Sequence, residues 1–302
     1  MIPNWTINNI TFAPIFQGVS CNKVANNYRN HYKPLLEHLE SHSFEEDLMF
    51  RDLAVVKQIG EGGFGVVYEA EHVVLQEKRV VKKLEPLFAN ENDTVKALKR
   101  FSREAQILSS LTHPNIVRFF DAGMAGDYPF IVMEYIDGCN LDKMISNEGM
   151  FAPSKAHQIM IQVLEAVAAA HNAGVVHRDI KPTNIMWNGQ RAVVLDYGAG
   201  QWVERRLSTR MTTTAIGTPG YIASELFENP QLLDPRLDCY SLGVVYHFIL
   251  TGRIPATGDA TYYMKSQGLG QDIQNFILKA IAPSQSRYSN GDEMHKALKL
   301  IA

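Results

Sequence analysis

Residues 177–184 read His-Arg-Asp-Ile-Lys-Pro-Thr-Asn, and this stretch decides how the rest of the sequence is interpreted. Twelve residues after Asn184 comes Asp196-Tyr197-Gly198, and a glycine-rich stretch, Gly60-Glu-Gly62-Gly-Phe-Gly65, lies far upstream. Together the three motifs supply a phosphate cover, a candidate base and two candidate metal ligands. None of them is specific alone, but their order and spacing indicate one site for chemistry on a phosphorylated ligand.

Size and composition place few limits on this interpretation. The chain has 302 residues, 46% hydrophobic and 20% charged, which is enough for one large domain or two lobes that share a cleft. A net charge of -3 gives no sign of binding to nucleic acid or to anionic membranes. The three cysteines are an odd number and well separated, so we expect neither a disulfide framework nor a zinc site. Their scarcity fits a reducing compartment.

The amino-terminal part carries no readable motif. It lacks a basic region followed by an apolar run, and no stretch of the chain approaches 18 apolar residues. We therefore expect no secretion signal, no membrane span and a cytoplasmic protein. Residues 1–50 are interpreted as an extension packed on the main domain, with a short helix over 35–42; a regulatory or targeting arm is the alternative.

The order of predicted elements indicates two unlike lobes. Short β-rich runs separated by turn signals dominate the first part, and helical periodicity dominates the second. The expected strands are Leu53–Ile59, Gly65–Glu71, Arg79–Leu84, Phe130–Tyr135 and Ala192–Leu195. The expected helices lie at about 94–111, over 157–172 and over Leu237–Leu250.

The glycine-rich stretch continues as Gly60-x-Gly62-x-x-Gly65-x-Val67. Glycines let a backbone approach phosphates closely. A dinucleotide-binding fold uses the same spacing but needs a helix directly after the loop, whereas residues 66–70 alternate like a strand. The pattern favours a strand–loop–strand phosphate cover, and the absence of Gly-Lys-Ser/Thr excludes a P-loop.

Lys82 lies fifteen residues after Val67 in a predicted strand. A lysine on a strand adjacent to the glycine loop can neutralise phosphates as a point charge, although most lysines are simply solvated. Lys83 fits the solvated role better, because alternation places it on the opposite face. Glu104, on the helix that follows, is predicted to pair with Lys82 and position it.

These motifs resemble those of eukaryotic-type (Hanks-type) serine/threonine protein kinases over roughly residues 53–300. The resemblance implies an α+β, bilobal fold, with a small β-rich N-lobe at about 51–136 and a larger helical C-lobe at about 137–302. Together they form a kinase domain over 51–302. Further segments carry the resemblance: His113–Val117, Met133–Ile136, Gly217–Glu225, Asp238 and Arg287.

The resemblance assigns a role to each polar residue of the catalytic stretch. Asp179 is the candidate base, which orients the substrate hydroxyl and accepts its proton. Lys181 would stabilise charge that develops on the transferred group. Asn184 and Asp196 would bind two Mg²⁺ ions, with Mn²⁺ as an alternative, because both offer oxygen. His177 invites a general-base role but is interpreted as a packed structural residue.

The resemblance also places an ATP site. Its residues would be Gly60, Gly62, Gly65, Val67 and Lys82, with the backbone groups of Glu134 and Ile136 receiving adenine. Met133 would limit the depth of the adenine pocket. Cys139 is interpreted as an incidental thiol.

Two features concern the hydroxyl that would receive the phosphate and the regulation of the activity. Lys181 matches the serine/threonine-specific pattern, and Thr218 would hydrogen-bond Asp179 and Lys181; dual specificity stays open. The segment between Asp196 and Glu225 resembles an activation loop. If the loop were phosphorylated, the guanidinium of Arg178 would pair with the phosphate. Its candidate phosphorylation sites are Thr214, then Thr213 and Thr212, modified by autophosphorylation in trans during transient self-association.

The sequence departs from the family pattern at two positions. Tyr197 replaces the usual Phe, and its hydroxyl needs a partner. Ser224 replaces the usual Pro before Glu225, which is still expected to pair with Arg287. The alternatives are a pseudokinase that binds ATP without turnover and a small-molecule phosphotransferase. Lys82, Asp179, Asn184 and Asp196 argue against the first, and the segment Gly217–Glu225 favours a protein substrate over the second.

Overall fold

The computed structural model describes most of the chain and divides it into two compact units. The first contains Met1–Glu91 and Phe120–Tyr135, and the second contains Asn92–Phe119 and Ile136–Ala302. The described residues are 5–7, 10–12, 49–50, 52–62, 65–84, 102, 105–125, 128–197, 220–229, 232–255 and 259–301.

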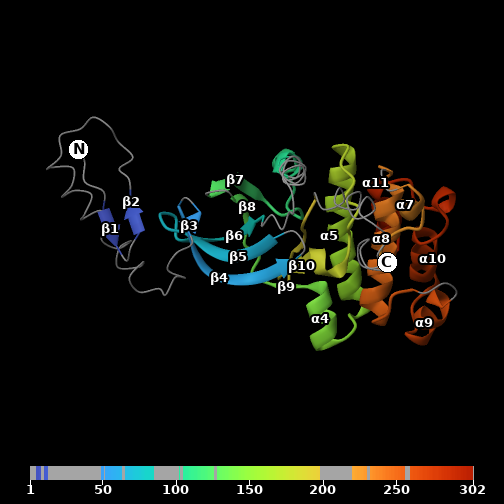
Figure 1. The fold of residues 1–302 in the computed structure, drawn as a ribbon. Helices are drawn as coiled ribbons and strands as arrows, with labels where there is room; N and C mark the ends of the chain where they lie inside the picture. The colour runs from blue at the N-terminus through green and yellow to red at the C-terminus, as the bar shows by residue number, and fades with distance from the viewer. Residues whose placement is uncertain are drawn as a thin grey trace. The chain divides into compact units, whose positions relative to one another are not determined.

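The first unit is built on a six-stranded sheet with the order β3-β4-β5-β6-β8-β7 (Figure 1). The pairs β3–β4, β4–β5, β5–β6 and β6–β8 are antiparallel. The short strands β1 and β2 form a separate antiparallel pair. The bounds are β1 (Trp5–Ile7), β2 (Ile10–Phe12), β3 (Met49–Phe50), β4 (Leu53–Gly62), β5 (Gly65–His72), β6 (Glu77–Lys83), β7 (Phe119–Ala125) and β8 (Tyr128–Glu134).

The two faces of this sheet differ in composition. On one face Tyr68, Val81 and Val132 form a row across three strands, and all three belong to a buried apolar core. On the other face Val67 lies opposite Lys82, which lies opposite Ile131. Directly paired residues share a face and successive residues alternate between faces. The alternating sequence pattern of β5 and β6 therefore sets which side chains reach the core.

The second unit is mainly helical, with one small sheet. That sheet is antiparallel with the order β11-β10-β9. Its strands are β9 (Cys139–Asn140), β10 (Ile185–Trp187) and β11 (Ala192–Val194). The helices are α4 (Leu141–Glu148), α5 (Pro153–Asn172), α7 (Glu225–Glu228), α8 (Arg236–Thr251), α9 (Ala260–Ser266), α10 (Gln271–Ala280) and α11 (Gly291–Lys299), with 3-10 turns at Pro182–Asn184 and Ser284–Ser286.

Helix α8 lies at the centre of the second unit and contacts α5, α9, α10 and α11. It is buried along most of its length, as its apolar sequence predicts. Helix α5 begins four residues before the expected start, at Pro153, because proline suits the first helical position. Gly174, with φ +76°, takes the left-handed conformation just beyond its end.

These two units confirm the expected α+β class: a β-rich first unit and a larger helical second unit. None of the helices described is both long and apolar enough to cross a membrane. Helix α9 has seven residues. The helix expected over 35–42 lies outside the described residues, and of the helix expected at about 94–111 residues 102 and 105–110 are described and helical.

Candidate active site

The carboxylate of Asp179 is the centre of a small polar cluster in the second unit. Lys181 Nζ lies 2.8 Å from Asp179 Oδ2. Asn184 Nδ2 donates to the carbonyl oxygen of Asp179 at 2.9 Å and to its Oδ2 at 3.2 Å. Among the described residues both side-chain donors engage Oδ2, which leaves Oδ1 as the oxygen that can accept a proton from a bound hydroxyl.

The backbone just before Asp179 is strained and is supported from α8. Arg178 has φ +64°, in the left-handed region that side-chain-bearing residues rarely adopt. Asp238 accepts hydrogen bonds from the backbone N–H groups of His177 and Arg178, each at 2.7 Å. Burial raises the pKa of Asp238, but hydrogen bonds to the carboxylate outweigh it, so the pKa lies below its ordinary value. A buried, ionised carboxylate therefore stabilises this turn.

His177 has a structural role in this turn. Its Nε2 lies 2.7 Å from the carbonyl oxygen of Leu195, and its Nδ1 accepts a hydrogen bond from the backbone N–H of Asp179 at 3.2 Å. With both ring nitrogens bonded to backbone, the side chain has no nitrogen left to act as a base. This geometry agrees with the interpretation of His177 as a packed residue.

Asn184 and Asp196 lie at the same end of the β10–β11 hairpin. Ile185 pairs with Val194, and the N–H of Leu195 donates to the carbonyl oxygen of Asn184 at 2.8 Å. Asn184 uses its amide nitrogen toward Asp179, so its Oδ1 is the atom available to a cation. An amide oxygen beside a carboxylate is a donor set that fits Mg²⁺. The described residues thus fit the predicted metal-binding role.

Tyr197 replaces the family's phenylalanine and packs against the ring of His177, with centroids 4.8 Å apart. It is 1% exposed, and its hydroxyl has no hydrogen-bond partner among the described residues. Burial raises the pKa of this phenol well above its ordinary value, so the group stays neutral. Within the described part of the chain, the hydroxyl has therefore lost its hydration without gaining a hydrogen bond.

We expect the Tyr197→Phe variant to be more stable than the wild-type chain by about 1 kcal/mol, because the ring contact remains and the unpaired hydroxyl is removed. Urea denaturation of both proteins measures the difference. Tyr246→Phe is the matched comparison, since its buried hydroxyl also lacks a partner in the described part of the chain. A loss of stability in Tyr197→Phe would show that the hydroxyl is satisfied after all.

The glycine motif forms the end of the β4–β5 hairpin in the first unit. Gly60 pairs with Val67, and Gly62 pairs with Gly65. Gly65 has φ +133°, and a Cβ there would lie 2.0 Å from the carbonyl oxygen of Lys83. Only glycine can occupy this position. A strand, and not a helix, follows the motif, which confirms the predicted strand–loop–strand arrangement.

The face of the sheet that carries Val67 also carries Lys82, as the alternation predicted. On the same face Val80 lies opposite Met133, which is buried. Lys83 lies on the other face, with its Nζ 4.1 Å from the ring centre of Tyr128. Glu134, in the expected adenine-binding segment, is the last residue of β8, and Ile136 follows two residues later.

The two lysines provide a matched pair of substitutions. We expect Lys82→Met to lower phosphoryl transfer by about 100-fold, because it removes a positive charge next to the predicted phosphate cover. Lys83→Met should change the rate by no more than about threefold, because that side chain is directed to the opposite face. Initial rates of phosphate transfer at saturating ATP measure both variants. Equal losses would contradict the assignment of Lys82.

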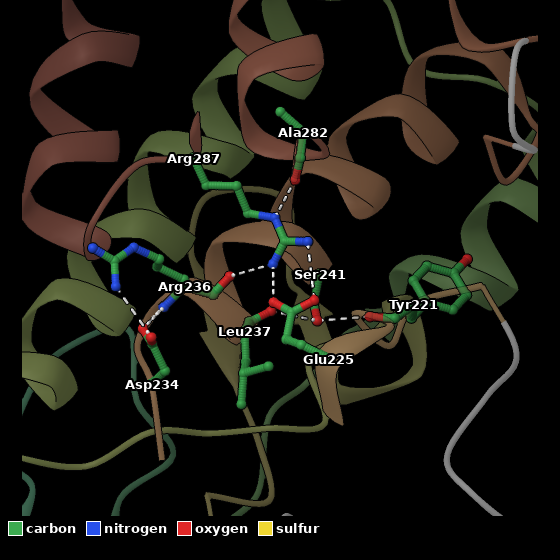
Figure 2. A network of polar contacts seen from close by, with 8 residues as sticks. All are labelled: Tyr221, Glu225, Asp234, Arg236, Leu237, Ser241, Ala282 and Arg287. Carbon is green, nitrogen blue, oxygen red and sulfur yellow. Dashed lines mark hydrogen bonds and ion pairs between the residues drawn. The ribbon is translucent and has the colours of Figure 1, made fainter. Parts of the chain in front are cut away.

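A second polar network anchors the segment after residue 220 (Figure 2). The guanidinium of Arg287 engages both carboxylate oxygens of Glu225, with Nη2 and Oε2 3.2 Å apart, and stacks over Tyr240. Ser241 Oγ donates to the carbonyl oxygen of Tyr221 at 2.7 Å. The predicted ion pair between Glu225 and Arg287 is therefore present, and Ser224 in place of proline does not prevent it.

The other predicted site residues lie outside the described part of the chain. They are Glu104, Thr218, Thr212, Thr213 and Thr214. The structure also places His171 on the buried face of α5, with its Nε2 2.9 Å from Asp238 Oδ2, and the sequence interpretation gave this residue no role. A histidine among alanines and valines on such a face was the signal for a buried polar partner.

The chain is similar in sequence to known protein kinases. A family described as "Protein kinase domain" matches residues 53–301. The chain is 35% identical over 261 residues to the serine/threonine-protein kinase PrkC of Bacillus subtilis, covering 81% of this chain and 40% of that protein. It is 34% identical to PknB of Mycobacterium leprae, covering 80% of this chain and 41% of that one. The chain thus spans about two fifths of these relatives.

A solved structure, "PpkA-294 apo form", has the same fold, with a TM-score of 0.72 at 22% sequence identity. The match covers 85% of this chain and 100% of that one.

Proposed function

Since this chain belongs to the protein kinase family, we propose that it transfers the γ-phosphoryl group of ATP to serine and threonine hydroxyls of proteins. The observation that supports this most is the cluster around Asp179. A carboxylate with one oxygen bound to a lysine and an amide, and the other available, suits a base that also orients a hydroxyl. The relatives' names support the same reaction.

Each residue of the cluster has one task in the proposed mechanism. The acceptor oxygen attacks the γ-phosphorus as the bond to ADP breaks, and the hydroxyl proton passes to Asp179. Lys181, bound to Asp179, places its positive charge where the transferred group becomes more negative. Lys82, with Glu104 as its predicted partner, would position the phosphates beneath Gly60, Gly62 and Gly65. No covalent enzyme intermediate is needed, because positioning and charge neutralisation lower the barrier.

The metal site follows from the same geometry. Asn184 and Asp196 would bind Mg²⁺, which supplies positive charge to the phosphate oxygens when it is bound. Asn184 also donates to Asp179, so its amide links the base to the metal site.

Serine/threonine specificity is part of the proposal. Lys181 and Thr218 match the pattern of serine/threonine kinases, and dual specificity is the alternative. We place residues 1–50 as an extension outside the kinase domain of 51–302, and the activity in the cytoplasm. The activation loop would be autophosphorylated on Thr214, Thr213 or Thr212 when two copies meet.

The test is transfer of labelled γ-phosphate from Mg-ATP to the purified chain and to a protein substrate rich in serine, threonine and tyrosine. We expect label on serine and threonine after acid hydrolysis, and on the chain itself at one of the three threonines. Label on tyrosine would establish dual specificity. Unchanged activity and self-labelling after the combined Thr212→Ala, Thr213→Ala and Thr214→Ala substitutions would rule out activation through these sites.

A further inference from the structure

Glu69 is a charged residue buried on the face of the first unit's sheet that also carries Val67 and Lys82. It lies two residues after Val67 on β5 and opposite Val80 of β6, and alternation places it on that face. The residue is only 3% exposed. A carboxylate that leaves water costs free energy unless it is paired, so a carboxylate at this place needs partners of opposite charge.

Two lysines from the neighbouring strands β4 and β6 supply that charge (Figure 1). Lys78 Nζ lies 2.8 Å from Glu69 Oε1, and Lys57 Nζ lies 3.3 Å from Glu69 Oε2, so each carboxylate oxygen has its own ammonium group. Burial raises the pKa of Glu69, but the hydrogen bonds and charges of the lysines outweigh it, and the pKa lies below its ordinary value. The carboxylate is therefore ionised at neutral pH and holds both ammonium groups, although the two lysine side chains are 57% and 63% exposed.

Lys78 has a second contact that distinguishes it from Lys57. Its Nζ lies 4.9 Å from the ring centre of Tyr135. Arg79 pairs with Glu134, so the same register brings Lys78 beside Tyr135, the first residue after β8. A cation within about 6 Å of an aromatic ring centre is attracted by the ring. Lys57 has no contact with Tyr135 among the interactions of the described residues.

We propose that Glu69 and Lys78 are positioning residues for the binding of ATP. Glu69 holds the ammonium group of Lys78 over the ring of Tyr135. This contact fixes the backbone at the end of β8, where Glu134 is predicted to receive adenine. A segment that is already ordered loses less conformational freedom on binding, and the apparent affinity rises with the fraction of molecules in the binding-competent conformation. The effect on ATP rests on the proposed kinase function, whereas the ordering of Tyr135 does not.

The two lysines give a matched pair of substitutions. Lys78→Met and Lys57→Met each remove one ammonium group from the same carboxylate, but only the first removes the contact with Tyr135. By calorimetric titration we expect Lys78→Met to raise the dissociation constant of ATP about fivefold, and Lys57→Met to change it by less than about twofold. Equal increases would show that only the positive charge of the surface matters, and would overturn the positioning role.

The buried carboxylate is tested by Glu69→Gln, which keeps the shape of the side chain but removes the charge that holds Lys78. It should raise the dissociation constant of ATP about fivefold, as Lys78→Met does. In both variants kcat at saturating ATP should stay within about threefold of wild type, because the proposed effect is on nucleotide binding. ATP binding as tight as in the wild type, or a loss confined to kcat, would overturn the role of Glu69.

The contact between Lys78 and Tyr135 is tested by a conservative variant and a double variant. Lys78→Arg keeps a cation for both the carboxylate and the ring, and should bind ATP within about twofold of wild type. Lys78→Met combined with Tyr135→Leu should bind ATP no more weakly than the weaker single variant, since both substitutions remove one contact. Losses that multiply in the double variant would overturn the proposal.

Hydrogen exchange followed by mass spectrometry tests the ordering of this segment without nucleotide. In the full chain, peptides that contain the amides of Tyr135 and Ile136 should exchange about fivefold faster in Lys78→Met and Glu69→Gln than in the wild type, and at the wild-type rate in Lys57→Met. Exchange in Lys78→Met that matches the wild type would overturn the proposal. If the wild-type chain bound no ATP, the proposed kinase function would fail, yet these exchange rates would still decide whether Lys78 orders the segment.

Discussion

The Asp179→Asn variant is expected to transfer phosphate about 10²- to 10⁴-fold more slowly than the wild-type chain, which is the usual contribution of a positioned acid or base. The geometry gives the reason. Lys181 and Asn184 both donate to Oδ2, so the amide must place its oxygen there. Its NH₂ group then occupies the position of Oδ1, where it can donate a hydrogen bond but cannot accept the proton of the hydroxyl.

Two further measurements identify the cause of that loss. Calorimetric titration with ATP should give a dissociation constant within about threefold of wild type, because the substitution acts on the acceptor side of the reaction. Asp272→Asn, in the exposed first turn of α10, controls for the loss of one negative charge and should leave the rate unchanged. A reduction of less than about tenfold in Asp179→Asn would contradict the role of this residue.

The second large effect concerns stability. Arg287→Met should lower the free energy of unfolding by about 3–5 kcal/mol, the usual cost of removing one partner of a buried ion pair. The side chain of Arg287 is 3% exposed and that of Glu225 is 20% exposed. Removal of Arg287 also takes hydrogen bonds from the carbonyl oxygens of Ala282 and Arg236. Since whole domains are stable by only about 5–15 kcal/mol, the variant should unfold at much lower urea concentration.

An exposed pair in the same unit provides the comparison. Lys296 and Asp292 lie 3.4 Å apart on α11, with the lysine side chain 75% exposed. Lys296→Ala should cost no more than about 1 kcal/mol, because solvent screens such pairs. The double variant Arg287→Met/Glu225→Gln should be less destabilised than the sum of the two single variants, since they share one interaction. Additive losses would show that Glu225 and Arg287 act independently.

The sequence predicted four strands of the six-stranded sheet in the first unit, β4, β5, β6 and β8, because their periodicity is strong, and it did not predict β3 or β7. Residues 66–70 alternate, and the structure places Val67 and Lys82 opposite each other on one face. Helix α8 was equally clear from its apolar run. The two- and three-residue strands β9 and β10 were not predicted, because segments of that length have no measurable periodicity.

Of the polar contacts at the site, some were predicted from the sequence and others were not. The pairing of Glu225 with Arg287 followed from family resemblance, although 62 residues separate them. The hydrogen bonds of Asp238 were not predicted, because they depend on backbone amides whose directions are set by the unusual φ of Arg178. The hydrogen bond from the N–H of Gly291 to His171 was not predicted for the same reason. Its donor is a main-chain N–H, a group that every residue except proline carries.

The most direct test of the account is a single-turnover experiment, in which enzyme in excess over labelled ATP is mixed with Mg²⁺ and a protein substrate. Binding and chemistry are then separated, because nucleotide capture and phosphate transfer are measured in one reaction. We predict that bound label passes to serine and threonine hydroxyls, and that the Asp179→Asn variant captures ATP but transfers its phosphate about 10²- to 10⁴-fold more slowly. Capture of ATP by the wild-type chain with no transfer to any hydroxyl would contradict it and identify an ATP-binding module without turnover.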